Sequence, residues 1–338
     1  MKITAIIVAC CCFATALTNA GAAEPKKVLV VTTTLGFRHS SIPAAEKVLQ
    51  QLADESKAFT IVDFAQQPTV AVPRKPNAPK KPAALKPDAS DADKAKYEKE
   101  MTKFQADEVK HKADLEKYMA NETANKAAQA EFDAAMKKSL EKLSPENLKK
   151  YDGVIFANTT GDLTLPDREA FIDWIKAGHA FIGMHSCGDT FHGFPRFLEM
   201  LGAEFRGHGA QVPADLHVID QNHPATTGLP SVWNIQQEEM YQFRNYDPTK
   251  VHDLCSMNHH PNNPTEAGLF PVSWCKKFGD GKVFYTSLGH REDIWDADPN
   301  MPNRKNTPEI AKQYQQHILG GIKWALGLAP GDATPQAK

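Results

Sequence analysis

Short apolar runs rich in β-branched residues recur along this chain, and most of them lead into a polar turn and then a helical pattern. Residues 28–33, 153–157 and 180–184 are such runs. Strands that are apolar on both faces are typical of a parallel sheet that helices cover on both sides. The sequence therefore predicts an α/β fold with a doubly wound, mostly parallel sheet. Further strand patterns after residue 210 indicate some antiparallel additions.

A long insertion interrupts this pattern between residues 67 and 149. It begins with a segment rich in proline and lysine, which predicts a stiff, extended and solvated linker. We interpret the glycine-free, charged stretch that follows as two long helices folded back into a hairpin, which can self-associate or dock a partner. A single solvated helix or a disordered spacer remains the alternative. The helical interpretation depends on apolar residues that recur at helical spacing: Tyr97, Met101, Phe104, Leu115, Tyr118, Phe132, Met136, Leu140 and Leu143.

The flanking parts of the chain, residues 24–66 and 150–330, then form a single α/β domain, followed by a flexible tail at 331–338. Residues 1–23 resemble an export signal, with Lys2 before a short apolar run and small residues at its end. We therefore expect a periplasmic or secreted protein, with a lipid anchor on one of the early cysteines as the less favoured alternative. No later segment is apolar and long enough to predict a transmembrane helix.

Charge and cysteine content narrow the function further. The formal net charge of -2 gives no electrostatic reason to expect nucleic acid as a partner. Beyond the signal only Cys187, Cys255 and Cys275 remain, too few for a disulfide scaffold. A bridge between Cys255 and Cys275 and buried free thiols both remain open.

Four histidines lie where an apolar run gives way to a polar turn: His39, His185, His208 and His290. In an open α/β sheet, ligands bind at the carboxyl ends of the strands. Imidazoles gathered there can move protons near neutral pH or bind a metal ion. We therefore predict a shared site, against the alternative of four independent surface histidines.

An acidic and a phenolic side chain complete this set. Glu239 and Tyr241 alternate along an expected strand, so they share a face while Glu238 points away. A carboxylate among imidazoles is either a general acid or base or a metal ligand. No spacing of a structural zinc site is present, but a divalent ion such as Zn²⁺ or Mn²⁺ can be bound by His185, His208, Glu239 and His290. A site without any cofactor is the alternative.

Several short motifs follow one another in a distinctive order: GFRH at 36–39, FIGMHS at 181–186, LGAEFRGH at 201–208, VIDQNHP at 218–224, EEMY at 238–241, PVSW at 271–274 and GH at 289–290. Together they resemble the ThuA-like family, named for trehalose utilisation. The resemblance covers roughly residues 26–66 and 150–327 and implies a fold similar to class I glutamine amidotransferases. In those enzymes a cysteine occupies the tight strand-to-helix turn where this chain has His185. An imidazole does not replace a thiolate as the acyl-forming nucleophile, so glutaminase activity is not expected.

The family resemblance also implies a carbohydrate as the small-molecule partner, acted on through 3-keto sugar intermediates. We expect an isomerase, lyase or hydrolase in which His185 or Glu239 is the base and His39 also takes part. The substrate-binding residues would be Arg38, His208, Tyr241, His290, Phe37 and Trp274, with Trp295 as a further ring for stacking. A sugar-binding or scaffold module without catalysis and a metal-dependent hydrolase are the alternatives.

Overall fold

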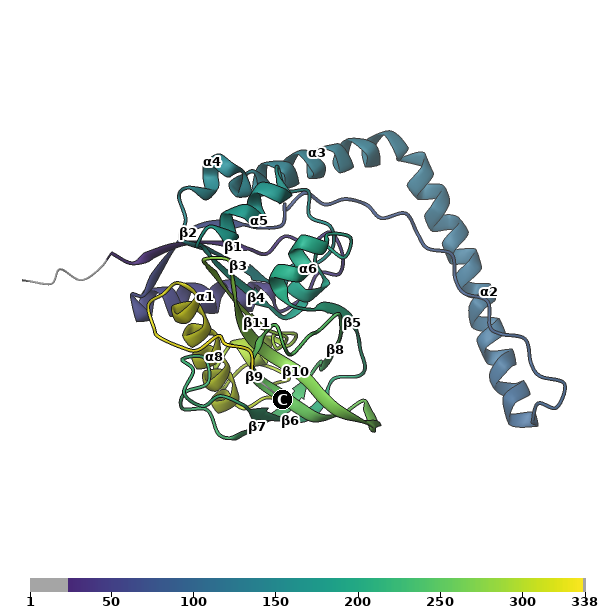
Figure 1. Cartoon of the computed structure of the whole chain (residues 1–338). Helices are drawn as coiled ribbons and strands as arrows, with labels where there is room; N and C mark the ends of the chain where they lie inside the picture. Colours follow the sequence, from purple (N-terminus) through teal and green to yellow (C-terminus); the bar gives the residue numbers. More distant parts are fainter. Residues whose placement is uncertain (1–23, 337–338) are drawn as a thin grey trace, which may run out of the picture.

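A nine-stranded mixed sheet forms the centre of the molecule (Figure 1). The computed structural model describes residues 24–336, and the strand order is β2-β1-β3-β4-β11-β10-β9-β6-β7. Its first five strands run parallel, in an order known from flavodoxin-type doubly wound sheets. They are β1 (Lys26–Val31), β2 (Phe59–Ala65), β3 (Gly153–Ala157), β4 (Ala180–Met184) and β11 (Gly281–Thr286).

The other half of the sheet is antiparallel. Four neighbouring strand pairs are parallel and four are antiparallel, so the antiparallel additions expected after residue 210 are present but make up half of the sheet, and the sheet is mixed rather than mostly parallel. Parallel strands need a long crossover, usually a helix, whereas a short turn can join antiparallel strands. The connection from β9 to β10 is such a short turn and contains no helix. The strands are β6 (Val212–Val218), β7 (Val232–Glu238), β9 (His252–His260) and β10 (Asn263–Phe278), with a separate ribbon of β5 (Glu204–His208) and β8 (Tyr241–Arg244).

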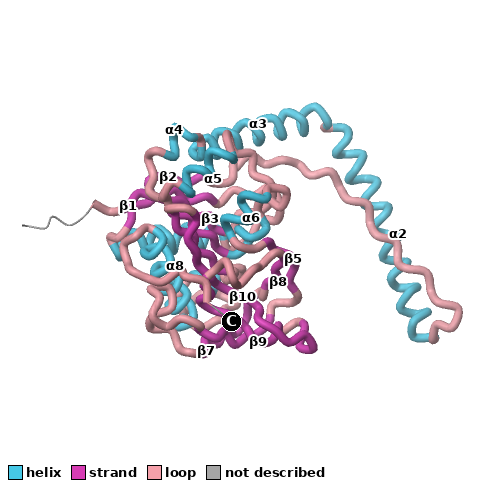
Figure 2. Tube along the Cα trace, in the orientation of Figure 1, coloured by secondary structure: helices cyan, strands magenta, loops and turns pink. Residues whose placement is uncertain are grey.

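Helices cover the parallel half on both faces, which explains its continuous apolar strands (Figure 2). Along β1, Val28 and Val30 belong to one hydrophobic core while Leu29 and Val31 belong to the other. Alternate residues of a strand point to opposite faces, so both sets must be apolar. The first core contains α1 (Ile42–Ser56), α7 (Glu292–Trp295) and α8 (Pro308–Ala325); the second contains α4 (Pro145–Leu148), α5 (Arg168–Lys176) and α6 (Pro195–Leu201).

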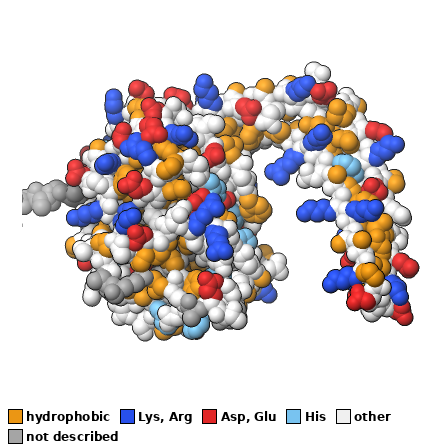
Figure 3. Space-filling view, turned by 45° about the vertical axis from the view of Figure 1, so that its right-hand side comes forward, with side chains coloured by type: hydrophobic (Ala, Val, Ile, Leu, Met, Phe, Trp, Pro, Cys, Tyr) orange, Lys and Arg blue, Asp and Glu red, His pale blue; other side chains and the backbone are white. Residues whose placement is uncertain are grey.

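The insertion forms an arm that projects from the body (Figures 1 and 3). An extended segment leads outward to Ser90, which caps α2 (Asp91–Ala120) in a capping box with Asp93. No residue of α2 is buried, and charged and hydrophobic side chains are mixed along the arm. The chain returns through α3 (Glu122–Leu140), whose Met136 and Leu140 pack into the second core. Between residues 24 and 336, no helix combines the length and apolar character needed to cross a bilayer.

The two long helices are present, but they do not fold back on each other as a hairpin. They follow one another through a bend at Asn121, and the extended segment before α2 supplies the outward path instead (Figure 1). A hairpin of helices needs a loop of about two to five residues, whereas one residue separates α2 from α3. Asn125 donates from its side chain to the carbonyl of Tyr118, so the carbonyls at the end of α2 are satisfied within the bend.

Hydrogen bonds join the last described residues to the start of β9, at the place of the expected flexible tail. His252 Nδ1 lies 2.6 Å from the carbonyl of Thr334, and the Gln336 side chain exchanges two hydrogen bonds of 3.0 Å with the backbone of Asp253. Cys187, Cys255 and Cys275 are buried free thiols, so no bridge joins Cys255 to Cys275. The expected export signal, residues 1–23, lies outside the described residues.

Two buried histidines outside the strand-end loops predict that acid destabilises the fold. Burial lowers the pKa of both His223 and His317 to about 4. Between pH 6.5 and about 4 the unfolded chain binds protons at these positions and the folded chain does not, so stability is complete above pH 6.5 and is lost as the pH falls. The loss is up to about 1.4 kcal/mol per pH unit for each histidine. Burial raises the pKa of Glu238 to about 7, which offsets part of this loss.

Urea unfolding at pH 7, 6 and 5 measures this effect. His317→Asn keeps an amide donor toward the carbonyl of Ala225, the partner of His317 Nδ1 at 2.7 Å, and should make the pH dependence shallower. An unchanged slope in that variant would contradict the assignment.

Candidate functional site at the ends of the parallel strands

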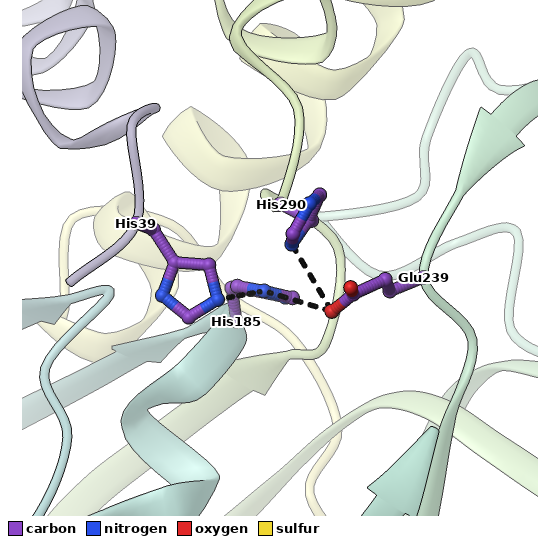
Figure 4. A group of neighbouring side chains, drawn as sticks. All are labelled: His39, His185, Glu239 and His290. Carbon is purple, nitrogen blue, oxygen red and sulfur yellow. Dashed lines mark hydrogen bonds and ion pairs between the residues drawn. The ribbon is translucent and has the colours of Figure 1, made fainter. Parts of the chain in front are cut away.

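Three of the four strand-end histidines meet at one edge of the parallel half of the sheet (Figure 4). His39 lies between β1 and α1, His185 begins the 3₁₀ turn after β4, and His290 lies between β11 and α7. The carboxyl ends of parallel strands lie at a common edge, so residues distant in sequence converge there. This is the arrangement that the spacing of the motifs predicts.

The antiparallel half and the ribbon add the other members. Glu239 lies in the turn between β7 and β8, and Tyr241 begins β8. One ligand atom from each of His39, His185, Glu239 and His290 lies within 4.8 Å of the others. Tyr241 donates its hydroxyl proton toward Nε2 of His185 over 3.0 Å. We call these five residues the strand-end cluster.

His208 stands at the border of the strand-end cluster. It ends β5, where it pairs with Tyr241, and its Nδ1 lies 3.4 Å from a carboxylate oxygen of Glu239. Its side chain is 38% exposed, whereas that of His185 is fully buried. The four-residue group suited to a metal therefore contains His39 in place of the expected His208.

The backbone at His185 is held in an uncommon conformation. Its φ is 47°, in the left-handed region that costs most residues about 1–3 kcal/mol. The Tyr285 hydroxyl donates to the carbonyl of His185 over 2.6 Å and supports this turn. Gly289 follows β11 with a φ of 130°, and a Cβ there would lie 3.2 Å from that of His185. The tight turn predicted around His185 is thus present and projects the imidazole into the strand-end cluster.

Hydrogen bonds define the protonation of His185. The Ser287 carbonyl, 2.7 Å from Nδ1, can only accept, so Nδ1 carries the proton and Nε2 presents its lone pair to the strand-end cluster. Burial, followed by the neighbouring His39, holds the pKa of His185 well below its usual value. Burial likewise lowers the pKa of His39 to about 4, with His290 adding to the effect. Both imidazoles are therefore neutral near pH 7.

His290 differs from these two imidazoles. Burial acts to lower its pKa, but the hydrogen bond with Glu239 and the charges of Glu238 and Glu239 give a net rise. Its Nδ1 lies 3.0 Å from Glu239 Oε2, and its Nε2 lies 2.7 Å from the amide nitrogen of Gln211. His290 is consequently the imidazole best suited to donate a proton.

Glu238 has a role that the sequence did not predict. It was expected to point away, and its carboxylate is in fact buried behind the strand-end cluster. It accepts hydrogen bonds from the backbone N–H groups of Glu239 at 3.1 Å, His290 at 2.9 Å and Arg291 at 3.3 Å. One carboxylate therefore ties the turn that carries Glu239 to the loop that carries His290.

Three further residues support the strand-end cluster, and two of them, Asn158 and Gln211, escaped the sequence reasoning. Asn158, in a left-handed conformation after β3, donates to Ser41 Oγ and to the carbonyl of Gly289, both over 2.9 Å. Its place directly after an apolar run is the same signal that the histidines carry. Ser186 Oγ lies 3.2 Å from His39 Nδ1, and Gln211 contacts His290 as described above. No local pattern marks Gln211.

Several expected substrate-binding residues lie elsewhere. Trp274 is fully buried in the second core and donates to the carbonyl of Leu201, and Trp295 is fully buried and donates to the carbonyl of Gly289. Neither ring is available for stacking, because each fills the protein interior. Arg38 donates to the carbonyl of Thr32, so it braces its own turn. Phe37 is 67% exposed, with its ring 4.8 Å from that of His39, and is the aromatic residue at the border.

Cys187 is not part of the strand-end cluster. Its thiol is fully buried in the second core, and burial raises its pKa far above the usual value. A thiol that remains protonated is a poor nucleophile. Its place matches the expected small buried thiol two residues beyond His185.

Comparisons with known proteins agree on one family. A family model described as ThuA, trehalose utilisation, matches residues 97–325, which include every member of the strand-end cluster except His39. A ThuA-like protein from Parabacteroides merdae is similar in structure, with 17% identity, 90% of each chain covered and a TM-score of 0.52. A ThuA-like protein from Bacteroides uniformis has 16% identity and a TM-score of 0.53, covering 90% of this chain and 93% of its own. These likenesses show a shared mixed α/β fold. The search of curated proteins found no match.

Proposed function

The chain belongs to the ThuA family of trehalose utilisation, and from this premise we propose that it acts on an oxidised, 3-keto glycoside by proton transfer. The resemblance of its motifs to ThuA-like proteins implies a sugar that carries a ketone. From the resemblance of residues 1–23 to an export signal, we also propose that it works in the periplasm or outside the cell. An amidotransferase-like ancestry is part of the proposal, supported by the tight turn at His185.

One observation carries this proposal: a carboxylate lies among three imidazoles at the ligand-binding edge of the sheet, all within 4.8 Å. Two of these imidazoles are neutral near pH 7 because they are buried, and the third has a raised pKa. Groups that differ in this way can act as base and acid in the same reaction. The exposed ring of Phe37 offers an apolar surface beside them.

The chemistry assigns Glu239 as the base. The C–H bond next to a ketone breaks, its proton moves to the Glu239 carboxylate, and its electron pair forms the carbon–carbon double bond of an enolate. The negative charge then lies on the former ketone oxygen, where N–H of His290 can stabilise it. Return of the proton to the other face of that carbon gives an isomer, whereas expulsion of the glycosidic oxygen, which takes the proton from the Glu239 carboxyl, gives cleavage. The lone pair of His185 Nε2 already accepts a hydrogen bond from Tyr241, so we assign the Glu239 carboxylate rather than His185 as the base.

Incubation with 3-keto and unmodified disaccharides in D₂O, followed by product NMR, tests this function. We expect deuterium at the carbon next to the ketone of keto-glycosides and none in unmodified sugars, because only the ketone makes that C–H acidic. Hydrolysis without deuterium incorporation would favour a metal-dependent hydrolase. Sugar binding without exchange or turnover would favour a non-catalytic binding module. Either outcome contradicts the proton-transfer proposal.

A further inference from the structure

The nitrogen atoms of the strand-end cluster are spaced for a metal ion. His185 Nε2 and His39 Nε2 lie 3.2 Å apart, and His290 supplies a third ring nitrogen to the group within 4.8 Å. Bonds of about 2.0–2.1 Å to a tetrahedral zinc ion place two nitrogen ligands about 3.3 Å apart. Three loops that are distant in sequence each supply one imidazole (Figure 4). The His39–His185 pair thus has the spacing of two nitrogens on one ion, and the ligand atom of His290 lies within 4.8 Å of both.

The second ring nitrogens have partners that would orient the lone pairs correctly. His185 Nδ1 must donate to the Ser287 carbonyl, which leaves Nε2 without a proton. Its lone pair lies 3.0 Å from the Tyr241 hydroxyl and 3.2 Å from His39 Nε2, and a bound ion would take the place of the Tyr241 proton as its partner. His39 Nδ1 lies 3.2 Å from Ser186 Oγ, which can accept its proton and leave a second lone pair on Nε2. Two lone pairs at 3.2 Å repel each other unless a proton or a cation lies between them. Bonds from the outer ring nitrogen to a carbonyl or hydroxyl are the usual support of histidine metal ligands.

His290 needs one adjustment to serve as the third ligand. Its Nδ1 can bind an ion when Nε2 carries the proton, and Nε2 then needs an acceptor. A half-turn of the Gln211 amide supplies Oε1 at that place, since the two ends of an amide are similar in shape. Arg291, which now donates to Gln211 Oε1, keeps its two contacts of 3.0 Å to Asp293. The change therefore costs one hydrogen bond and leaves the surrounding loop intact.

We infer that His39, His185 and His290 bind one divalent transition-metal ion of the Zn²⁺ type, with Glu239 beside it as the base. Imidazole ligands select such ions over Mg²⁺ and Ca²⁺, which prefer oxygen. Three protein ligands leave a coordination position open, as in catalytic zinc sites. A ketone oxygen bound there is polarised, which makes the neighbouring C–H more acidic. The inference deepens the proposed function, with the ion taking the place of the His290 N–H as the group that stabilises the enolate oxygen, and rests on it only in assigning Glu239 as the base.

Metal binding itself, measured without any sugar, tests the inference. Chelator-treated full-length protein is titrated with Zn²⁺ by calorimetry, and the bound ion is counted by mass spectrometry after desalting. We expect about one ion per chain. In His39→Asn, the amide keeps the contact toward Ser186 but Nε2 is lost, so affinity should fall by more than the ~10–100-fold typical of second-shell changes. The matched variant His208→Asn should keep the wild-type stoichiometry, and so should Glu239→Gln.

Each result either supports or overturns the ligand assignment. Co²⁺ should give the intense visible absorption of a tetrahedral site in the wild type and His208→Asn, and Zn²⁺ should raise the Tm of both but not that of His39→Asn. Absence of stoichiometric metal from the wild type, or full binding by His39→Asn, overturns the inference. Loss of the ion from Glu239→Gln overturns the role of Glu239 as a free base, and equal loss from His208→Asn overturns the choice of ligands. Deuterium exchange without bound metal would refute this inference alone, whereas bound metal without exchange would refute the proposed function alone.

Discussion

Glu239→Gln is expected to lower kcat/KM for 3-keto glycosides by about 10²–10⁴-fold, the usual contribution of a general acid or base. The amide has the shape of the carboxylate but cannot accept the proton. The side chain is 9% exposed and lies 3.0 Å from His290 Nδ1 and 3.4 Å from His208 Nδ1, so the loss should arise from chemistry rather than misfolding. Steady-state kinetics and the rate of deuterium exchange in D₂O should fall together.

Glu309→Gln is the matched control, because Glu309 is an exposed residue in the first turn of α8, outside the strand-end cluster. Its kinetics should equal those of the wild type. If Glu239→Gln kept exchange within about tenfold of the wild type, the carboxylate would not be the base, since a lost general base costs at least about 10²-fold.

His185→Asn should reduce kcat/KM by about 10²–10³-fold, because it removes a ligand of the inferred metal ion, and loss of a group that stabilises developing charge on an oxygen has an effect of this size. Asparagine is the appropriate replacement for two structural reasons. It tolerates the left-handed backbone that His185 adopts, with its φ of 47°. Its amide nitrogen can also take the place of Nδ1 and donate to the Ser287 carbonyl, so that only Nε2 is lost.

Thermal unfolding separates this effect from instability. The Tm of His185→Asn should stay close to that of the wild type, because the turn and its hydrogen bond are retained. His259→Asn, on an exposed position of β9, serves as the control for replacing a histidine. Normal turnover by His185→Asn would remove His185 from the reaction, and a collapsed Tm with partial turnover would assign it to the fold.

The parts of the fold that the sequence predicted are those with strong local patterns. Residues Val28 to Val31 are all apolar, so the sequence predicted a strand that is covered on both faces. In the structure each face of this strand packs into its own hydrophobic core. The histidines after such strands met for a topological reason: carboxyl ends of parallel strands share an edge. The relative positions of α2 and α3 were not predictable from their apolar spacing, because that spacing identifies a helix but not the direction of the next one.

The errors at the site have a common cause. Trp274 and Trp295 were assigned to sugar stacking because they were expected near the crevice at the strand ends, yet both rings fill the cores. Aromatic residues serve in cores and in binding sites alike, and sequence shows no difference between the two uses. Gln211 and Glu238 act through contacts with residues about 50 to 80 positions away, at His290 and Arg291. Such contacts leave no local signal.

The bond network around Glu238 constrains how this protein can diversify. Its carboxylate holds backbone groups of Glu239, His290 and Arg291 together, so the turn after β7 and the loop after β11 form one mechanical unit. An insertion in either loop would displace the reactive groups of both. The outer border is more accessible, since Phe37 is 67% exposed and the side chain of His208 is 38% exposed. New sugar preferences are therefore expected to evolve, or to be engineered, at Phe37 and His208, while the interior stays unaltered.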